Sequence, residues 1–433
     1  MMATRATFPS MAAVAWRPVG KGHAVFALGV GLTWLHVLDA SLVHRQAHAG
    51  VLEELALALM AIVLPPLAVL AYPRASMVIR AAVASTVGFV ALSGGLAMHV
   101  AGIVMNERWV RSDATGVLMA VGGGVLVVLG VVLATAAIPR RRYRLLMVPG
   151  VLVSLAFVLV PLGLAVAITH VPRRAVVEQD LGAAYQSVAF ETSDGLTLRG
   201  WYVPSRNGAA VVIAHGSGSN RLGGVRHARV LVEHGFGVLL YDARGHGESD
   251  GATNMLGWGA DLDIVAAARF AEAQPDVEAG RVGILGLSMG AELAIEAAAH
   301  SDVLAAVVAD GASGRTLGDA RDASPPRSVV LTQLPALFVA DTAVSLLSGR
   351  AAPANLTSLS PLVQEPVLYV AAGQDPIERA LVSRIASESG GEHELWVVDA
   401  GHTRGLATFP AEYEARVIGF FERWLASAGA NAR

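Results

Sequence analysis

One segment constrains the fold of this chain more than any other. Residues 282–290 form an apolar run that enters Gly286-x-Ser288-x-Gly290, and a helix-forming run follows at once. A serine on so tight a strand-to-helix turn is held in strained backbone geometry, and flanking glycines remove the side chains that would collide there. Such a turn exposes the hydroxyl at the edge of a sheet. We therefore expect Ser288 to be a nucleophile.

Two later segments offer the partners that a nucleophilic serine needs, a base and a carboxylate that orients the base. One apolar run ends at Asp375, and a second is followed by His402. This order predicts Asp375 as the acid and His402 as the base. Two alternatives stay open for the carboxylate. Asp375 precedes Pro376 and would also suit a helix N-cap, and Asp399 lies three residues before the histidine.

Backbone amides are the expected donors to the oxyanion that forms during acyl transfer. Met289 begins the helix after the turn, where unpaired N–H groups and the helix dipole favour negative charge. A second donor is expected in the glycine-rich turn that follows an apolar strand at 210–215. We interpret His215 and His246 as structural residues of their own glycine turns, and the segment 242–249 as a structural loop.

Strand and helix patterns alternate along this part of the chain. A hairpin is expected over 188–203, strands over 210–215, 237–241, 281–285 and 303–309, and helices over 223–235, 258–273 and 289–299. This alternation predicts an α/β fold with a mostly parallel sheet covered by helices on both faces. Residues 311–364 interrupt it with prolines and an apolar run, and we expect them to form a cap over the site or to rest on lipid.

Residues 185–427 resemble the α/β-hydrolase superfamily. Within them, the motif Asp242-x-Arg-Gly-His-Gly-x-Ser249, the closing Gly401-His402-Thr, and Tyr413 followed by Phe420-Phe421 resemble the Bem46-like and serine-aminopeptidase-like branch. The chain departs from the family at Ala372, where a glycine usually precedes the acid. The resemblance implies that Ser288 is the nucleophile, Asp375 the acid, His402 the base, and the amides of Ser217 and Met289 the oxyanion hole.

The first 170 residues have a different character. The whole chain is 54% hydrophobic and 15% charged, with a mean hydropathy of +0.53, and this bias is concentrated near the N-terminus. Apolar runs at 24–43, 51–72, 81–104, 114–138 and 145–169 each have about the 20 residues that cross a bilayer as a helix. We expect an N-terminal segment (1–23), a five-helix transmembrane bundle (24–169), a linker (170–186) and the hydrolase domain (187–427).

Basic residues in the short loops predict the orientation of a multi-pass membrane protein. With a cytoplasmic N-terminus, nine lie inside (Arg5, Arg17, Lys21, Arg74, Arg80, Arg140, Arg141, Arg142 and Arg144) and five outside (Arg45, Arg108, Arg111, Arg173 and Arg174). This predicts an extracytoplasmic hydrolase domain. We interpret the ionisable residues His36, Asp39, His44, His48, Glu53 and Glu54 as interfacial, although His44 and His48 have a spacing that also suits a metal.

These features favour a membrane-anchored serine hydrolase that cleaves an ester, thioester or amide through an acyl-enzyme, with no metal or cofactor. The expected partners are the lipid bilayer and a small-molecule or lipid-like acyl substrate, with a peptide substrate also open. A net charge of −3 argues against nucleic acid. The alternative function is a membrane sensor or transport accessory protein with a non-catalytic hydrolase-fold domain.

Overall fold

The computed structural model describes residues 20–39, 63–95, 111–137, 158, 160–169, 173–252, 254–323 and 327–431. The chain forms two compact units. The first comprises residues 1–43 and 55–149, and the second comprises residues 44–54 and 150–433.

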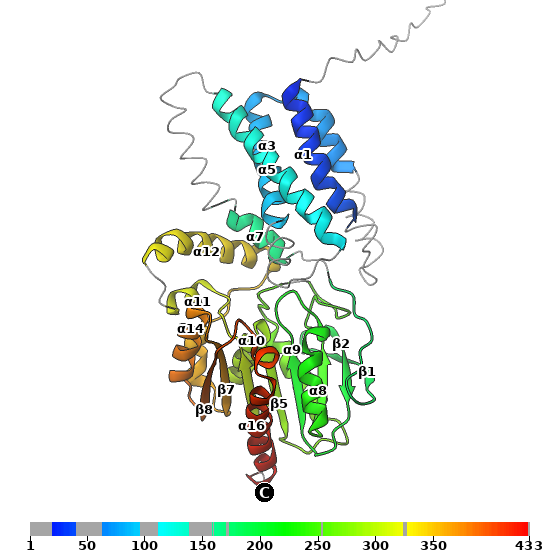
Figure 1. Cartoon of the computed structure of the whole chain (residues 1–433), viewed down its shortest axis with the longest axis vertical. Coiled ribbons are helices and arrows are strands. Elements are labelled where there is room, and N and C mark those ends of the chain that lie inside the picture. Colours follow the sequence, from blue (N-terminus) through cyan, green and yellow to red (C-terminus); the bar gives the residue numbers. More distant parts are fainter. Residues whose placement is uncertain are drawn as a thin grey trace, which may run out of the picture. The chain divides into compact units, whose positions relative to one another are not determined.

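Helices make up the described part of the first unit (Figure 1). They are α1 (Lys21–Leu38), a helix at 63–71, the short η2 (Tyr72–Arg74), α3 (Met77–Gly95) and α5 (Arg111–Ala137). Glycines let α3 and α5 touch through their backbones: a Cβ added at Gly123 would lie 2.3 Å from the amide nitrogen of Leu92. Between α1 and α5, a Cβ at Gly122 would lie 2.7 Å from the carbonyl oxygen of Gly29. Close packing through small residues is typical of helices in membranes.

The five predicted spans are not confirmed. Within the described ranges, one helix is long and apolar enough to cross a bilayer, at Ala114–Ala137, and the apolar part of α3 is shorter, at Met77–Leu92. Large parts of the predicted spans 51–72, 81–104 and 145–169 lie outside the described residues.

Two ionisable residues at the C-terminal end of α1, His36 and the C-cap residue Asp39, contact α5. His36 Nδ1 lies 3.1 Å from the Thr115 hydroxyl oxygen, and that hydroxyl donates to Asp39 at 2.7 Å. This interhelical link explains how the first helix accommodates two ionisable groups. The other members of the predicted cluster, His44, His48, Glu53 and Glu54, lie outside the described residues.

The second unit contains an eight-stranded sheet in the order β1-β2-β4-β3-β5-β6-β7-β8. Strand β2 runs antiparallel to β1 and β4, and the other pairs are parallel. The strands are β1 (Gln186–Glu191), β2 (Thr197–Val203), β3 (Ala210–Ala214), β4 (Gly237–Tyr241), β5 (Val282–Leu287), β6 (Ala306–Asp310), β7 (Val367–Ala372) and β8 (His393–Val398). The predicted hairpin and the predicted mostly parallel sheet are confirmed.

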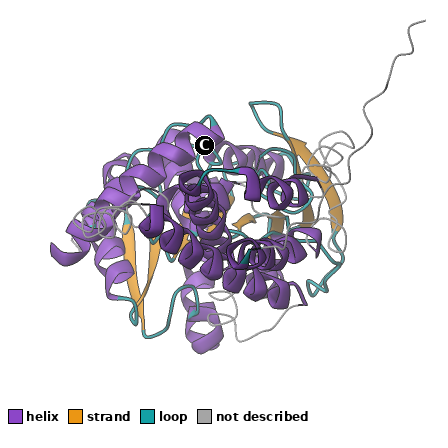
Figure 2. Ribbon diagram, turned by 90° about the horizontal axis from the view of Figure 1, so that it is seen from above, coloured by secondary structure: helices purple, strands orange, loops and turns teal. Residues whose placement is uncertain are grey.

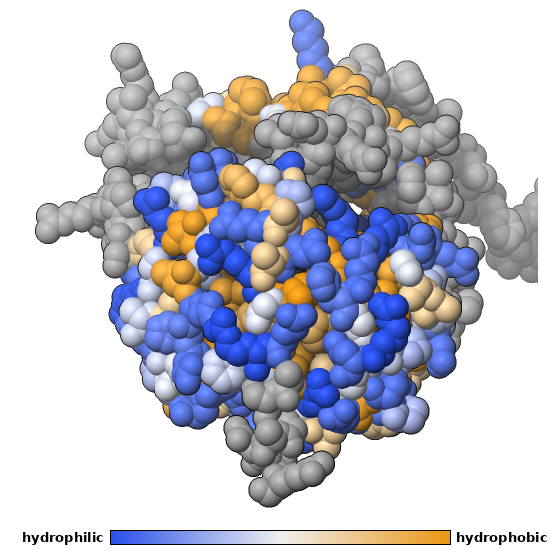
Figure 3. Space-filling model, turned by 60° about the horizontal axis from the view of Figure 1, so that its bottom comes forward, coloured by the Kyte–Doolittle hydropathy of each residue, from blue (hydrophilic) through white to orange (hydrophobic). Residues whose placement is uncertain are grey.

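Helices cover both faces of this sheet (Figures 1 and 2). Alternate residues of a strand point to opposite faces, so Val212 of β3 packs in one core and Val211 in the other. The first core contains α9 (Asp261–Glu272), α10 (Met289–His300) and α14 (Pro376–Ser387), and the second contains α8 (Val225–Glu233) and α16 (Pro410–Asn431). Hydrophilic side chains predominate on the face in Figure 3, as expected where helices bury only their apolar sides.

The insertion predicted between β6 and β7 is helical. It contains α11 (Leu317–Asp322), α12 (Arg327–Ser348), α13 (Leu356–Leu359) and the short η6 (Ser360–Leu362). Helix α12 packs against α7 (Val160–Thr169), the apolar helix that precedes the sheet in sequence. Short segments complete the element order at η5 (Arg221–Gly224) and α15 (Gly405–Thr408).

Candidate active site

Ser288 lies on the turn that joins β5 to α10. Its backbone has φ 55° and ψ −117°, a conformation that L-residues rarely adopt and that often marks a functional site. A Cβ added at Gly286 would lie 2.3 Å from the carbonyl oxygen of Gly290, and one added at Gly290 would lie 2.2 Å from that of Ala214. Both glycines are therefore required by close backbone contacts, as the sequence predicted.

His402 follows β8 and lies next to the serine. Its Nε2 is 2.8 Å from Ser288 Oγ, and its Nδ1 is 2.6 Å from Oε2 of Glu378. Because a carboxylate can only accept, the ring carries its proton on Nδ1 and donates it to Glu378. Nε2 is then free to accept the serine proton. Ser288, His402 and Glu378 thus form one hydrogen-bonded chain, the arrangement expected of a nucleophile, a base and an orienting carboxylate.

The carboxylate that meets His402 is not the one predicted. Asp375 is the N-cap of α14, where its carboxylate accepts from the amides of Ile377 at 2.9 Å and Glu378 at 3.1 Å. The prediction of Asp375 as the acid is therefore wrong in this structure, and the N-cap alternative holds. The rival Asp399 lies near the side chain of Gln374 instead.

Glu378 reaches the histidine from the first turn of α14. The side chain is about 1% exposed, and its second oxygen, Oε1, accepts from the amide of Ala372 at 2.8 Å. That bond fixes the carboxylate against the end of β7. A glutamate has one more methylene than an aspartate, so it can reach His402 from a position one turn further along the chain. The sequence signal was Pro376-Ile-Glu378, a helix start with an acidic residue in its first turn.

Buried acidic groups shape the electrostatics around His402. The hydrogen bond with Glu378 raises the pKa of His402 above its usual value, with burial opposing this effect. Burial also raises the pKa of Asp310, at the end of β6, to about 7. The Tyr413 hydroxyl donates to this carboxyl at 2.8 Å, and the Asp310 carbonyl accepts from the Ser288 amide at 2.8 Å. Asp310 was not predicted, although it is a polar residue at the carboxyl end of a strand.

The two predicted oxyanion donors flank the serine. Met289 is the next residue along the chain, and a Cβ added at Gly216 would lie 3.3 Å from that of Ser288, which brings the turn of Ser217 against the nucleophile. Neither the Ser217 amide nor the Met289 amide donates a hydrogen bond to another described residue. The Ser217 hydroxyl donates to the carbonyl of Met255 at 2.6 Å, which holds this turn in place.

His215 and His246 are structural, as interpreted from the sequence. The Nδ1 of His215 donates to the Gly216 carbonyl at 2.8 Å, and its Nε2 accepts from the Ala243 amide at 3.1 Å. The Nδ1 of His246 donates to the Arg244 carbonyl at 3.0 Å. Burial lowers the pKa of His215, and it lowers that of His246 to about 3. Both rings therefore stay neutral at physiological pH.

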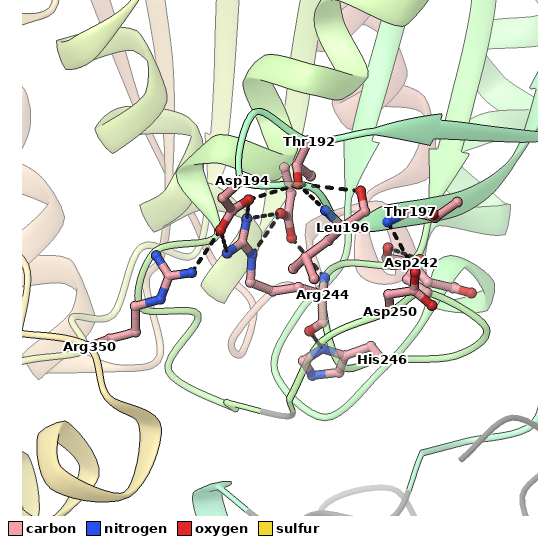
Figure 4. A network of polar contacts seen from close by, with 11 residues as sticks. Thr192, Asp194, Leu196, Thr197, Asp242, Arg244, His246, Asp250 and Arg350 are labelled. Carbon is pink, nitrogen blue, oxygen red and sulfur yellow. Dashed lines mark hydrogen bonds and ion pairs between the residues drawn. The ribbon is translucent and has the colours of Figure 1, made fainter. Parts of the chain in front are cut away.

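The loop 242–249 takes part in a network of ion pairs, part of which is drawn in Figure 4. Asp242 pairs with Arg221 at 2.6 Å, and neither side chain is more than 2% exposed. Arg244 binds Asp263 at 2.6 Å and Asp194 at 2.8 Å, and Arg350, which follows α12, also binds Asp194 at 2.8 Å. The network fastens the loop after β4 to the β1–β2 turn and to the segment that follows α12. It contains no contact with Ser288, which agrees with a structural role.

Among the described residues, Asp261, Glu296 and His300 could approach a common metal ion. Glu296 already forms an ion pair with the guanidinium of Arg315. We therefore interpret this cluster as a charge network, since Glu296 is already neutralised by a buried cation.

Comparison with known proteins gives a consistent family assignment. The profile of the alpha/beta hydrolase family matches residues 211–416. An uncharacterized protein of Mycobacterium tuberculosis is 36% identical over 117 residues, 26% of this chain and 40% of the relative. A polyketide transferase of a Penicillium species is 34% identical over 131 residues, 28% of this chain and 43% of the relative. The chain thus spans about two-fifths of the length of these relatives.

Among solved structures, an esterase of Pyrococcus furiosus is 26% identical, with a TM-score of 0.49, over 60% of this chain and 98% of the esterase. The family profile begins in β3 and ends in α16, and it contains both Ser288 and His402. From its sequence match and its strand order, the second unit of the chain has the α/β-hydrolase fold.

Proposed function

We propose that this protein is a serine hydrolase that cleaves an ester, thioester or amide bond through an acyl-enzyme. The observation that carries the proposal is the continuous hydrogen-bonded chain from Ser288 Oγ through His402 to Glu378, with steps of 2.8 and 2.6 Å. These distances are within the range that proton transfer between a nucleophile and a base requires. The triad is thus Ser-His-Glu in place of Ser-His-Asp.

In the first half-reaction, Ser288 Oγ attacks the substrate carbonyl carbon while its proton passes to Nε2 of His402. Glu378 stabilises the imidazolium that forms, and the amides of Ser217 and Met289 donate to the new oxyanion. The tetrahedral intermediate then collapses. The bond to the leaving group breaks, and His402 returns the proton to the departing alcohol, thiol or amine.

In the second half-reaction, water attacks the acyl-enzyme and His402 takes one of its protons. The Ser288 Oγ–acyl bond breaks, His402 returns this proton to the serine oxygen, and a carboxylic acid leaves. The buried loop 242–249 and the Tyr413–Asp310 bond, which keep the surrounding loops in place, support assignment to the Bem46-like or serine-aminopeptidase-like branch.

The proposal includes attachment to a membrane through the N-terminal unit, with the hydrolase domain on the extracytoplasmic side. The apolar helix Ala114–Ala137 and the glycine-mediated contacts among α1, α3 and α5 support attachment. A test is to fuse alkaline phosphatase, which is active only outside the cytoplasm, after Arg433. Phosphatase activity in the alkali-washed membrane fraction is expected. An inactive fusion would contradict the orientation, and release into the wash would contradict attachment.

A burst experiment tests the catalytic proposal. Purified full-length protein is mixed with p-nitrophenyl acetate. Rapid release of about one p-nitrophenol per protein is expected before the steady state, because the acyl-enzyme of this activated ester should form faster than water hydrolyses it. Ser288→Ala should remove the burst while the circular dichroism spectrum stays unchanged. A burst that survives in Ser288→Ala would contradict the proposal, and inertness toward esters, thioesters and amides would favour the non-catalytic alternative.

A further inference from the structure

A cavity of about 260 Å³ lies within the second unit, between α7, α12 and the loop that follows β6. Its walls include Leu164 and Ile168 from α7, and Leu337, Ala340 and Val344 from α12. Around it, Ala165 of α7 packs in one buried cluster with Trp258, Ala343 and Val344. The cavity is thus mainly apolar and is built jointly by α12 and by α7, which precedes the sheet in sequence.

Three chain segments connect the walls of this cavity to the surroundings of Ser288. Ile377 lines the cavity, and the next residue, Glu378, binds His402. Ser313 also lines it, two residues after Gly311, where an added Cβ would lie 3.0 Å from Cε1 of His402. Each of these lining residues lies within two positions of a residue that touches the histidine.

The third segment joins α7 to the turn that offers the oxyanion amide. Leu256 lines the cavity, and its neighbour Met255 donates its amide proton to the carbonyl of Ile168 at 3.1 Å. The carbonyl of the same Met255 accepts from the Ser217 hydroxyl at 2.6 Å. Residue 255 therefore bridges the end of α7 and the turn beside the nucleophile.

We propose that this cavity binds the unbranched acyl chain of the substrate, and that α7, which lies ahead of the hydrolase sheet in sequence, is one of its two walls. The inference rests on the proposed function and names the substrate class: esters or thioesters of medium-chain fatty acids. An apolar cavity of about 150 Å³ accepts benzene, so 260 Å³ holds a chain of about eight to ten carbons.

Most of the polar residues around the cavity are bonded to other protein groups. The guanidinium of Arg315 pairs with Glu296 through Nη2, whereas its buried Nε and Nη1 have no hydrogen-bond partner among the described residues. The Asp341 carboxylate accepts from the Leu317 amide at 2.8 Å. The Thr316 hydroxyl is bonded to Asp319 at 2.8 Å. The two unpartnered nitrogens of Arg315 are buried, so the apolar walls supply most of the surface that a ligand meets. An aliphatic chain is the ligand that gains most from such walls.

The test compares kcat/KM for p-nitrophenyl octanoate with that for p-nitrophenyl acetate, in detergent and with the full chain. Leu164→Phe narrows the cavity from α7, and Ala340→Phe narrows it from α12. Each should lower the octanoate-to-acetate ratio by about tenfold or more, because a single methylene in an apolar pocket already changes specificity about tenfold. Val344→Ala should shift the preferred ester toward longer chains. Misfolding would lower the rates on octanoate and acetate equally. It therefore cannot explain a preference for shorter chains in the two Phe variants together with a preference for longer chains in Val344→Ala.

Matched controls lie on the same helices. Leu162 of α7 is 40% exposed and Leu346 of α12 is 80% exposed, and neither lines the cavity. Leu162→Phe and Leu346→Phe should leave the octanoate-to-acetate ratio unchanged. An unchanged ratio in Leu164→Phe and Ala340→Phe would overturn the inference while leaving the proposed hydrolase in place.

A binding measurement separates the two proposals. Octanoate is titrated calorimetrically into Ser288→Ala, which needs no turnover, and binding with a negative heat-capacity change is expected because apolar surface is buried. Adding Leu164→Phe should remove this binding. If the wild type hydrolyses no ester, the proposed function fails, yet octanoate binding still supports the cavity assignment. Absence of octanoate binding, together with an unchanged octanoate-to-acetate ratio in the Phe variants, would contradict the cavity assignment.

Discussion

Glu378 and His402 form the contact that defines the candidate site: Oε2 of the glutamate lies 2.6 Å from Nδ1 of the histidine. The carboxylate comes from the first turn of α14, not from the loop that follows β7. Asp375, at the end of that loop, caps the same helix. One acidic residue thus fixes the helix that carries the other.

Exchange of each acidic residue separates these two roles. Glu378→Gln should lower kcat by about 10⁴-fold, because the amide can no longer select the Nδ1–H tautomer and stabilise the imidazolium. Asp375→Ala should instead reduce the free energy of unfolding by about 1 kcal/mol, the usual effect of losing an N-cap. Ester kinetics and urea unfolding measure the two effects. Asp375→Asn keeps a side chain that can cap the helix. If kcat fell strongly in this variant and little in Glu378→Gln, Asp375 and not Glu378 would be the acid of the triad.

The pH dependence of catalysis should follow His402. The base acts only when neutral, so kcat/KM should rise with pH through the His402 pKa, and the midpoint should lie above the ordinary value because Glu378 raises this pKa. In Glu378→Gln the midpoint should move to lower pH. A pH–rate profile on p-nitrophenyl acetate checks both shifts. An unmoved midpoint in Glu378→Gln would show that this carboxylate does not act on the ring.

The raised pKa of His402 also makes the stability of the fold depend on pH. A histidine whose pKa is higher in the folded than in the unfolded state stabilises the fold below the unfolded value, and this contribution disappears as the pH rises through the folded value. Loss of Glu378 should therefore weaken stability more at pH 5 than at pH 9. Thermal unfolding of Glu378→Gln and wild type at both pH values measures the difference. A larger loss at pH 9 would contradict the raised pKa.

Arg315 is a buried cation whose removal should destabilise the domain. Its side chain is about 1% exposed and pairs with Glu296, which is itself buried. Arg315→Met leaves that carboxylate without its partner and should reduce the free energy of unfolding by about 3–5 kcal/mol. Arg423→Met is the control, since its ion pair with Glu394 is exposed and its loss should change stability by less than about 1 kcal/mol. Equal effects in the two variants would argue against the buried pair.

Gly247 should not tolerate a side chain. Its φ is +45°, and an added Cβ would lie 2.1 Å from a carboxylate oxygen of Asp242. Gly247→Ala should therefore lower the melting temperature by several degrees more than Gly280→Ala. Gly280 also has a positive φ, +72°, but an added Cβ meets no atom within 4 Å. Gly280→Ala therefore measures the cost of backbone strain by itself, about 1 kcal/mol. Similar melting temperatures would show that the loop relaxes around the new methyl group.

The sheet and the turn at Ser288 could be predicted from the sequence because local residue patterns determine them. Buried strands such as β3 are continuous apolar runs, and Gly286 and Gly290 are dictated by contacts within a few residues of Ser288 or with the adjacent strand. His402 followed from its place after the last strand. These signals need no knowledge of tertiary distances.

The acid was mispredicted because two acidic residues, Asp375 and Glu378, lie within one helical turn and differ only in direction and reach. Sequence spacing cannot tell which carboxylate points at the ring and which accepts amide protons. The cavity shared by α7 and α12 also escaped prediction, since its walls come from segments more than 150 residues apart. Hydropathy predicted a membrane span over residues 145–169, whereas α7, at the end of this range, packs against α12.

If Ser288 is an activated nucleophile, it should react covalently with an electrophilic probe. Full-length protein is treated with a fluorophosphonate probe, digested, and examined by mass spectrometry, with Ser288→Ala treated in parallel. One adduct is expected, on the peptide that contains Ser288, with slower labelling in His402→Ala and none in Ser288→Ala. An adduct on another serine, or undiminished labelling of Ser288→Ala, would contradict the role of Ser288 as the nucleophile.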